Sequence, residues 1–219
     1  MSAAARAQQP DAMGFVLAGG RSSRMGSDKA SAVFAGKTLL ARSLDLLHEA
    51  GLRASIAAAR SDLSAYAPVI HDRARQAGPL GGVCAAMAGS AEPWAVFVPV
   101  DLPLLPASLL SYLMWHARIT GAAVTVASVN GFVQTFPAVL ARSALPFLEE
   151  ELGNGRGSCI AAFRAAGAAR GMSTVPVELL AQAGQVEDRH GLAAPFWFLN
   201  VNTPADLERA GRRIRRPIA

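Results

Sequence analysis

A glycine-rich segment that ends in a lysine is the part of the sequence best suited to chemistry. The apolar residues 15–18 lead into LAGGRSSRMGSDK (residues 17–29), which holds three glycines, three serines, two arginines and Lys29. Glycines let backbone N–H groups approach an anion closely. Arginines donate paired hydrogen bonds to phosphate oxygens, and a lysine adds a compact positive charge. We therefore predict that this segment binds a polyphosphate.

Two common phosphate-binding loops do not fit the segment. A Walker loop has a lysine directly after its last glycine, whereas Gly26 is followed by serine and aspartate. A dinucleotide-binding loop needs GxGxxG, and the adjacent Gly19 and Gly20 break that spacing. Only two of the 21 basic residues are lysines, which favours a specific role beside phosphates for Lys29. Lys37 is expected to be a solvated turn residue.

Asp101 is the second candidate for chemistry. It follows the apolar run WAVFVPV (residues 94–100) and lies between Pro99 and Pro103. A carboxylate at the carboxyl end of a central strand can give Mg²⁺ one or two oxygen ligands, while nucleotide phosphates supply others. The alternative role, as N-cap of the next helix, is less favoured because Ser108 could serve there.

The positions of apolar residues divide the chain into alternating strands and helices. Strands separated by helices of about 10–15 residues are typical of βαβ units. We predict an α/β fold, a Rossmann-like three-layer α/β/α sandwich with a mostly parallel sheet, whose strand ends carry the ligand site. Residues 168–195 follow no clear pattern. The expected strands are residues 15–18, 54–59, 68–71, 94–98, 122–128, 132–140 and 196–199, and the expected helices are residues 38–50, 79–89, 108–119, 145–152 and 158–166 and one that starts at Pro204.

Capping signals mark the ends of two predicted helices. Gly51 follows the helix at residues 38–50 as a stop signal. Thr203 is suited to the N-cap of the last helix, with Pro204 at its first position and Asp206 in its first turn.

One domain is expected from residue 13 to residue 213, between a disordered N-terminal tail, residues 1–12, and a basic C-terminal tail, residues 214–219. Hydrophobic residues make up 52% of the chain and charged residues 17%, which suits a buried core. No apolar run approaches the ~18 residues that a membrane-spanning helix needs. The N-terminus lacks the apolar stretch of a secretory signal. We expect a cytoplasmic protein without a membrane partner.

The net charge of +5 comes from the C-terminus. Residues 209–219 contain five arginines and no acid, and the rest of the chain has sixteen basic and sixteen acidic residues. A basic face spread over the fold is therefore not supported, and nucleic acid is not an expected partner. Binding of nucleic acid through the arginine tail stays open as an alternative, and it predicts salt-sensitive binding.

The cysteines and histidines do not form a recognisable metal site. Cys84 and Cys159 are far apart in the sequence and lack CxxC spacing, so we expect them to be core residues. The four histidines are scattered without an HxxxH or HxH pair, which disfavours a zinc site.

Four stretches together resemble the bacterial molybdenum cofactor guanylyltransferases, a family within the nucleotidyltransferase class. They are LAGGRSSRMGSDK (residues 17–29), IHD with GPLGG (residues 70–72 and 78–82), VPVDLP (residues 98–103) and NVNTPADL (residues 200–207), in the family's order over nearly the whole chain. The resemblance implies a fold of the nucleotide-diphospho-sugar transferase type. It also implies transfer of GMP from GTP to molybdopterin carrying molybdenum, with Mg²⁺ as cofactor, pyrophosphate as second product, and transient contact with molybdenum cofactor enzymes.

The resemblance also implies roles for individual positions. Asp72 matches an aspartate of the guanosine site, and Asp101 matches the metal-binding aspartate. Asn200 and Asn202 match asparagines on the acceptor and metal side. A turn role for Asp72 and capping roles for the two asparagines stay open. The predicted catalytic residues are Arg24, Lys29 and Asp101, and the predicted nucleotide-binding residues are Leu17, Ala18, Gly19, Gly20, Gly26, Lys29, Asp72, Gly78, Pro79, Leu80 and Gly81.

Two positions depart from the family pattern. Ala59 stands where relatives often have an asparagine before the arginine, which removes a side-chain hydrogen bond to the nucleoside. Phe136 stands where relatives commonly have a histidine before proline, in the half expected to receive the acceptor. Two alternatives therefore stay open: a cytidylyl- or sugar-phosphate nucleotidyltransferase on the same fold, and a non-catalytic nucleotide-binding adaptor.

Overall fold

The computed structural model describes residues 11–19, 28–71 and 78–214. Four predicted site residues, Gly20, Arg24, Gly26 and Asp72, lie outside the described residues. Within the described part of the chain, no helix combines the length and the apolar character needed to cross a membrane.

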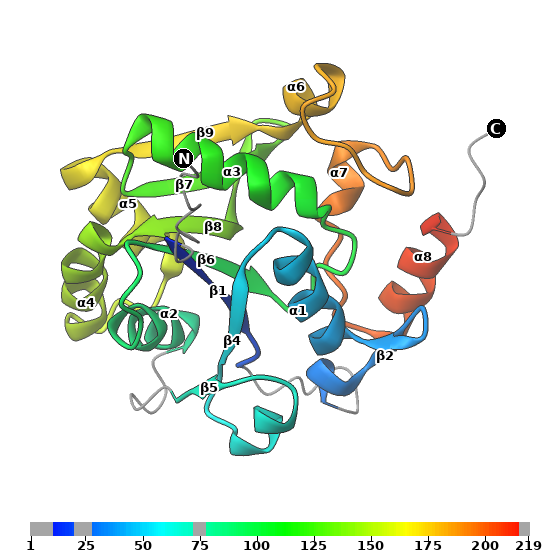
Figure 1. The fold of residues 1–219 in the computed structure, drawn as a ribbon, viewed down its shortest axis with the longest axis horizontal. Helices are drawn as coiled ribbons and strands as arrows, with labels where there is room; N and C mark the ends of the chain where they lie inside the picture. The colour runs from blue at the N-terminus through cyan, green and yellow to red at the C-terminus, as the bar shows by residue number, and fades with distance from the viewer. Residues whose placement is uncertain (1–10, 20–27, 72–77, 215–219) are drawn as a thin grey trace, which may run out of the picture.

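A seven-stranded sheet forms the centre of the molecule, in the order β5-β4-β1-β6-β8-β7-β9 (Figure 1). Every pairing is parallel except those that β8 makes with β6 and β7, so one strand runs against the other six. The predicted mostly parallel sheet is confirmed. The strands are β1 (Ala12–Leu17), β4 (Arg53–Ala57), β5 (Val69–Ile70), β6 (Trp94–Pro99), β7 (Val124–Val129), β8 (Phe132–Ala141) and β9 (Met172–Pro176), and a separate pair consists of β2 (Val33–Phe34) and β3 (Lys37–Thr38).

Helices cover both faces of the sheet, which confirms the predicted three layers (Figure 1). Along β1, Val16 joins the core beneath α1 and α3, whereas Phe15 and Leu17 join the core beneath α2, α4 and α5. A strand that is apolar on both faces is expected where helices cover both sides. The helices are α1 (Leu39–Glu49), α2 (Gly78–Ala88), α3 (Ala107–Thr120), α4 (Leu145–Gly153), α5 (Cys159–Arg170), α6 (Val177–Gln182), α7 (Ala194–Trp197) and α8 (Pro204–Ile214), with 3₁₀ turns η1 (Lys29–Ser31), η2 (Ser61–Ala65) and η3 (Arg142–Ala144).

The chain changes direction across the sheet at β1. After β1 it adds β4 and β5 on one side, and it then crosses to add β6 on the other side of β1. In open α/β sheets, ligands bind beyond the carboxyl ends of the strands at such a switch. The ends of β1 and β6 lie level, because Leu17 is paired with Pro99. The switch therefore falls between the two strands that lead into the predicted phosphate-binding segment and Asp101.

A tight hairpin reverses the direction of β8. Val129 pairs with Phe132, which leaves Asn130 and Gly131 in the turn, with φ angles of +50° and +79°. Two successive left-handed residues match the twist of an antiparallel pair, and an Asn-Gly sequence favours that turn. The apolar patterns predict both strands, and the Asn-Gly pair explains the reversal.

The predicted capping signals are confirmed at both helices. Gly51, with φ +78°, follows the end of α1 as predicted, and Thr38, expected as the first helical residue, is instead the N-cap, with its Oγ1 accepting from the Ala41 N–H at 3.1 Å. At α8, the Asp206 N–H donates to Thr203 Oγ1 at 3.2 Å, and the Thr203 N–H donates to Asp206 Oδ2 at 2.9 Å. This reciprocal pair is a capping box, and it fixes the start of the last helix.

The predicted strand at residues 196–199 is wrong, because α7 (Ala194–Trp197) occupies that position. A short apolar run fits a strand or one turn of buried helix equally well. Pro195 in the first turn favours the helix. Trp197 is 1% exposed, and its Nε1–H donates to the Leu192 carbonyl at 3.0 Å. Burial of this indole therefore decides the local structure.

Helices and strands also form in segments for which the sequence predicted none. Residues 168–195 contain the end of α5, all of β9 and all of α6. At the other end of the chain, β1 begins at Ala12, and Asp11 forms an ion pair with Arg118 on α3. Described structure thus begins two residues before residue 13, the expected start of the domain.

Candidate active site at the ends of two central strands

Three residues that are distant in the sequence meet beyond the ends of β1 and β6. Lys29 Nζ donates to Asp101 Oδ2 at 3.0 Å and to Asn202 Oδ1 at 2.6 Å, across 72 and 173 positions of sequence. The side chains of Lys29 and Asp101 are 17% and 22% exposed. A ligand can reach the cluster, and partial removal from water strengthens its ionic contact.

The backbone that follows β1 leads toward this cluster. Leu17 and Ala18 are buried, and the Ala18 N–H donates to the Ala57 carbonyl at 3.2 Å. The Ala18 N–H therefore belongs to the sheet rather than to a ligand. Gly19 is exposed, and a Cβ added to it would meet no atom within 4 Å.

A second ion pair fixes the turn that carries Lys29. Asp28 caps η1, with its Oδ1 accepting from the Ala30 N–H at 3.2 Å. Its Oδ2 lies 2.7 Å from Arg60 Nη1, and the same guanidinium pairs with Asp62 at 2.5 Å. Hydrogen bonds to Asp62 and then to Asp28 raise the pKa of Arg60. Arg60 thus ties the turn after β1 to the segment after β4.

Sequence reasoning did not predict the contact between Asp28 and Arg60. The signal that could have found it is their placement, because both residues follow the carboxyl ends of neighbouring parallel strands, β1 and β4. Such strand ends lie at one edge of the sheet, where opposite charges can meet.

Asp101 and Asn202 are held together through the backbone. The Val201 N–H donates to the Asp101 carbonyl at 2.9 Å, which joins the turn after β6 to the segment before α8. The Asn202 N–H donates to Asp206 Oδ2 at 3.0 Å, so the capping box of α8 also fixes Asn202. The Thr203 hydroxyl, followed by the Asn202 N–H, lowers the pKa of Asp206.

Asp101 is not a helix cap. Helix α3 has Pro106 at its N-cap and no side-chain capping bond. The Ser108 Oγ–H, the other candidate cap, donates instead to the Glu187 carbonyl at 2.7 Å. The capping alternative for Asp101 is therefore wrong, and its carboxylate faces Lys29.

The GPLGG stretch forms the first turn of α2. Gly78 has φ +62°, a conformation that favours glycine. Pro79 is exposed, whereas Leu80 and Gly81 are buried. The N–H groups at a helix N-terminus suit an anion, and α2 begins after β5, at the same edge of the sheet as the cluster.

Two predicted features of the acceptor side take no part in the hydrogen bonds of the cluster. Asn200 is exposed, and its side chain forms no hydrogen bond with another described residue. Phe136, joined to Pro137 by a cis peptide bond, packs edge-on against Phe163 with ring centroids 5.9 Å apart. The position where relatives commonly carry a histidine is therefore used here for packing.

The cysteines belong to the core, as predicted. Cys84 and Cys159 are both buried in the cluster beneath α2, α4 and α5. Burial, and then electrostatic repulsion from the nearby Cys84 sulfur, raise the pKa of Cys159 to about 12, so it stays a thiol at neutral pH. Among the described residues, no group of three or more His, Cys, Asp or Glu side chains could hold a metal ion.

Known proteins resemble this chain in sequence and in fold. The sequence model of the family described as MobA-like NTP transferase domain matches residues 14–170. The molybdenum cofactor guanylyltransferase of Photobacterium profundum is 30% identical over 203 residues, which cover 91% of this chain and 95% of that protein. The one from Sinorhizobium fredii is 33% identical over 215 residues, which cover 92% and 91%.

A solved structure supports the fold independently. The molybdopterin-guanine dinucleotide biosynthesis protein A of Archaeoglobus fulgidus superimposes with a TM-score of 0.74 at 21% identity, over 91% of this chain and 97% of that chain. The chain belongs to the MobA-like NTP transferase family and is a nucleotidyltransferase.

Proposed function

We propose that this protein transfers GMP from GTP to molybdopterin carrying molybdenum and releases pyrophosphate. Relatives that match nearly the whole chain are named molybdenum cofactor guanylyltransferases, which supports this substrate pair. The observation that carries the proposal is the meeting of Lys29, Asp101 and Asn202 at the switch between β1 and β6. On this proposal, one bound triphosphate would contact the cation of Lys29 and the metal held at the oxygens of Asp101 and Asn202.

The reaction is a phosphoryl substitution. The terminal phosphate oxygen of the acceptor attacks the α-phosphorus of GTP and forms a new P–O bond. The bond from the α-phosphorus to the bridging oxygen breaks, and its electron pair leaves with pyrophosphate. A phosphate nucleophile is already ionised, so the reaction needs no general base. Positioning and charge neutralisation are the tasks left to the protein.

Lys29 is suited to neutralise the triphosphate. Its ammonium group has three donors, of which Asp101 and Asn202 engage two before the substrates bind. In the complex, phosphate oxygens would take the place of Asp101. The Asp28–Arg60 ion pair holds the turn on which Lys29 lies. Arg24, outside the described residues, would add a second cation from the same segment.

The residues at Asp101 fit a magnesium ion. Asp101 Oδ2 and Asn202 Oδ1 converge on the ammonium of Lys29, so these oxygens already face a positive charge. Mg²⁺ prefers oxygen ligands, keeps several waters, and is commonly bound through one or two carboxylates together with substrate phosphates. We propose that Asp101 holds the ion, with Asn202 beside it. When bound, Mg²⁺ would supply charge stabilisation at the phosphates.

The two substrates would approach from different sides of the cluster. The first turn of α2, residues 78–81, would face the nucleotide with the positive end of the helix dipole. Asp72, outside the described residues, would contact the guanosine. Asn200, exposed before α8, would contact the acceptor together with Asn202.

Product analysis tests the proposal directly. The purified protein is incubated with molybdopterin carrying molybdenum, Mg²⁺ and one of GTP, CTP, UTP or ATP, and the products are identified by mass. Of the four nucleotides, we expect only GTP to give a dinucleotide product, the guanine dinucleotide, together with pyrophosphate. A cytidine dinucleotide instead would indicate a cytidylyltransferase. Thermal stabilisation by a nucleotide without any pyrophosphate release would indicate a binding adaptor. Either result would contradict guanylyl transfer.

A further inference from the structure

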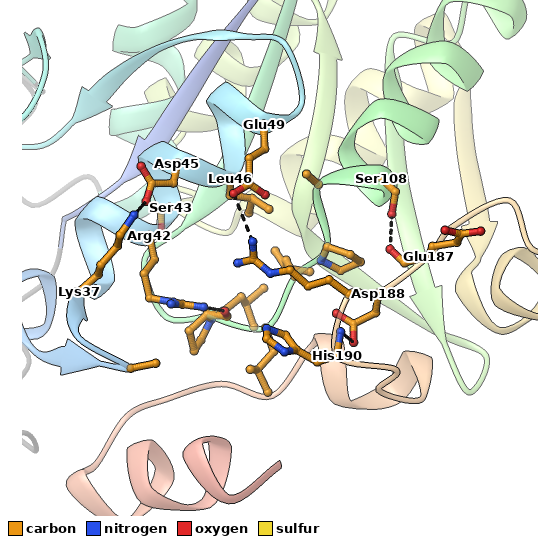
Figure 2. Close-up of a pocket in the computed structure, with 18 residues that line it drawn as sticks. Lys37, Arg42, Ser43, Asp45, Leu46, Glu49, Ser108, Glu187, Asp188 and His190 are labelled. Atoms are coloured by element: carbon orange, nitrogen blue, oxygen red, sulfur yellow. Dashed lines mark hydrogen bonds and ion pairs between the residues drawn. The ribbon is translucent and has the colours of Figure 1, made fainter. Parts of the chain in front are cut away.

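A cavity of about 300 Å³ lies between α1, the loop after β6 and residues 187–190 (Figure 2). Its wall includes residues 102–106, which directly follow Asp101, but neither Lys29 nor Asn202. Small-molecule sites start at roughly this volume. The cavity is therefore large enough for a small ligand at a place separate from the candidate active site.

Most of the charges in the wall are matched within the protein. Lys37 Nζ lies 2.6 Å from Asp45 Oδ2, and Arg189 Nη1 lies 3.4 Å from Glu49 Oε1. The Asp188 carboxylate accepts from two backbone N–H groups of its own loop, at 3.0 and 2.7 Å. These groups leave little unpaired charge of their own in the cavity.

Arg42 differs from these groups, because it has no carboxylate partner among the described residues. Its Nη2 reaches the Pro103 carbonyl at 3.4 Å, and its guanidinium lies over the Phe34 ring at 4.9 Å from the centroid. Its Nε is buried and has no hydrogen-bond acceptor. Buried donors are rarely left in that state, and Arg42 lines the cavity, so a small movement of its side chain would bring this N–H to an acceptor there.

The surroundings of Arg42 also favour an added negative charge. Burial and then the nearby charge of Arg189 lower the pKa of Arg42, and the carboxylates of Asp45 and Glu49 oppose this lowering only in part, since they pair with Lys37 and Arg189 instead. Glu187 does not supply the missing charge, because Figure 2 shows its carboxylate directed away from Arg42. An anion in the cavity would supply that charge.

We propose that the cavity binds a small molecule through an oxyanion, a carboxylate or a phosphate group, held by Arg42. The Nε–H and an Nη–H of a guanidinium form a fork that matches two oxygens of such a group. Figure 2 shows Arg42 reaching from α1 toward the segment that carries His190. Pro103 links the cavity to the candidate active site, since it lies two residues after Asp101.

The Nε–H of Arg42 can be followed directly by NMR of the arginine side chains. Its resonance is assigned by its loss in Arg42→Lys. Inorganic phosphate and acetate are titrated separately into the unsubstituted protein and into Lys29→Ala, in which anion binding at the candidate active site is weakened. We expect a saturable shift of the Arg42 resonance in both proteins with at least one anion. A shift with inorganic phosphate would indicate a phosphate ligand, and a shift with acetate would indicate a carboxylate ligand.

An exposed arginine supplies the matched control. Arg53 is paired with Glu92 and does not line the cavity. Arg42→Gln should weaken binding of the active anion about ten- to a hundredfold, as expected for lost charge-assisted hydrogen bonds, while Arg53→Gln should not. The proposal would be overturned if neither anion shifted the Arg42 resonance in a saturable way. It would also be overturned if Arg42→Gln and Arg53→Gln bound the anion equally well. If Arg42→Gln does not fold, the titration of the unsubstituted protein still tests whether an anion binds at Arg42.

Discussion

The ammonium group of Lys29 lies 3.0 Å from the carboxylate of Asp101, so the predicted phosphate-binding cation and the predicted metal-binding anion neutralise each other. Both side chains are mostly shielded from water, which makes an unpaired charge at either one unfavourable. On the proposed mechanism, a triphosphate with Mg²⁺ replaces this pairing with one partner for each residue. The ion pair therefore keeps the site in place before its substrates arrive.

Replacing Lys29 tests the cationic half of this arrangement. Lys29→Ala should lower the turnover rate about 10²–10³-fold, because it removes a positioned charge from the transferring phosphate. Pyrophosphate release at saturating GTP and acceptor measures the loss. Circular dichroism should show an intact fold.

The only other lysine of the chain is the matched control for this variant. Lys37 is 60% exposed and pairs with Asp45 away from the cluster. Lys37→Ala should keep a turnover rate close to that of the unsubstituted protein. Equal rates for the two lysine variants would argue against a role of Lys29 in transfer.

The ion pair between Asp28 and Arg60 should matter for activity more than for stability. Arg60→Ala should lower kcat/KM about ten- to a hundredfold, because displacement of a catalytic group by about 1 Å has effects of this size. The melting temperature should change little, since exposed ion pairs contribute little to stability. Steady-state kinetics and thermal unfolding separate the two effects.

A double-substitution cycle identifies the partner of Arg60. Asp28→Asn should reproduce the kinetic loss, and the double variant should lose no more than either single variant, because the two residues act through one contact. Arg53→Gln, which removes an exposed arginine elsewhere, should leave kcat/KM unchanged. Additive losses from the two substitutions would mean that Asp28 and Arg60 act separately.

Most of the fold could be predicted from short sequence patterns, namely apolar runs and capping residues. Helix α1 has Thr38 and Gly51 at its ends, and β6 is an unbroken apolar run. Lys29 and Asp101 were predictable as neighbours, because each follows a central strand of a parallel sheet. These features depend on residues that are close together in the sequence or on the general geometry of α/β sheets.

Other features depend on tertiary packing and could not be read from short patterns. Burial of Trp197 turns the apolar run at residues 196–199 into a turn of helix. The contact of Asn202 with Lys29 could be predicted only by following the fold of the chain over the 173 positions that separate them. The pairing of Arg60 with Asp28 likewise requires two loops to approach each other, which composition and spacing do not encode.

The capping box of α8 should contribute to stability. Thr203→Ala removes the oxygen that caps the helix, and losses of an N-cap typically cost about 1 kcal/mol in the free energy of unfolding. Urea unfolding measures this loss. Ser111→Ala, which removes an exposed hydroxyl from the interior of α3, is the control and should change the free energy of unfolding much less. A Thr203 variant as stable as the control would show that the box does not hold the start of α8.

Asp206 should make the stability depend on pH in the acid range. The Thr203 hydroxyl and the Asn202 N–H lower the pKa of Asp206 from its ordinary value of 3.8. Because the pKa is lower in the folded state, the carboxylate stabilises the fold above the unfolded value, and this stabilisation is lost as the pH falls through the folded value.

The comparison with Asp206→Asn isolates this effect. The stability difference between the two proteins, from urea unfolding at pH values between about 3 and 7, should be constant above about pH 5 and should shrink in more acidic solution. A difference that grows on acidification would show that the sign of the pKa shift is wrong.

The most direct test of the account is the rate of Asp101→Asn as a function of Mg²⁺ concentration. Asparagine keeps the size of the side chain and one oxygen but removes the charge, while Asp11→Asn, which alters an exposed aspartate paired with Arg118, serves as the control. We predict that Asp101→Asn releases pyrophosphate about 10²–10³-fold more slowly and needs more Mg²⁺ for half its maximal rate, whereas the control matches the unsubstituted protein. A rate near that of the unsubstituted protein at the same Mg²⁺ concentration would contradict the assignment of Asp101 to the metal.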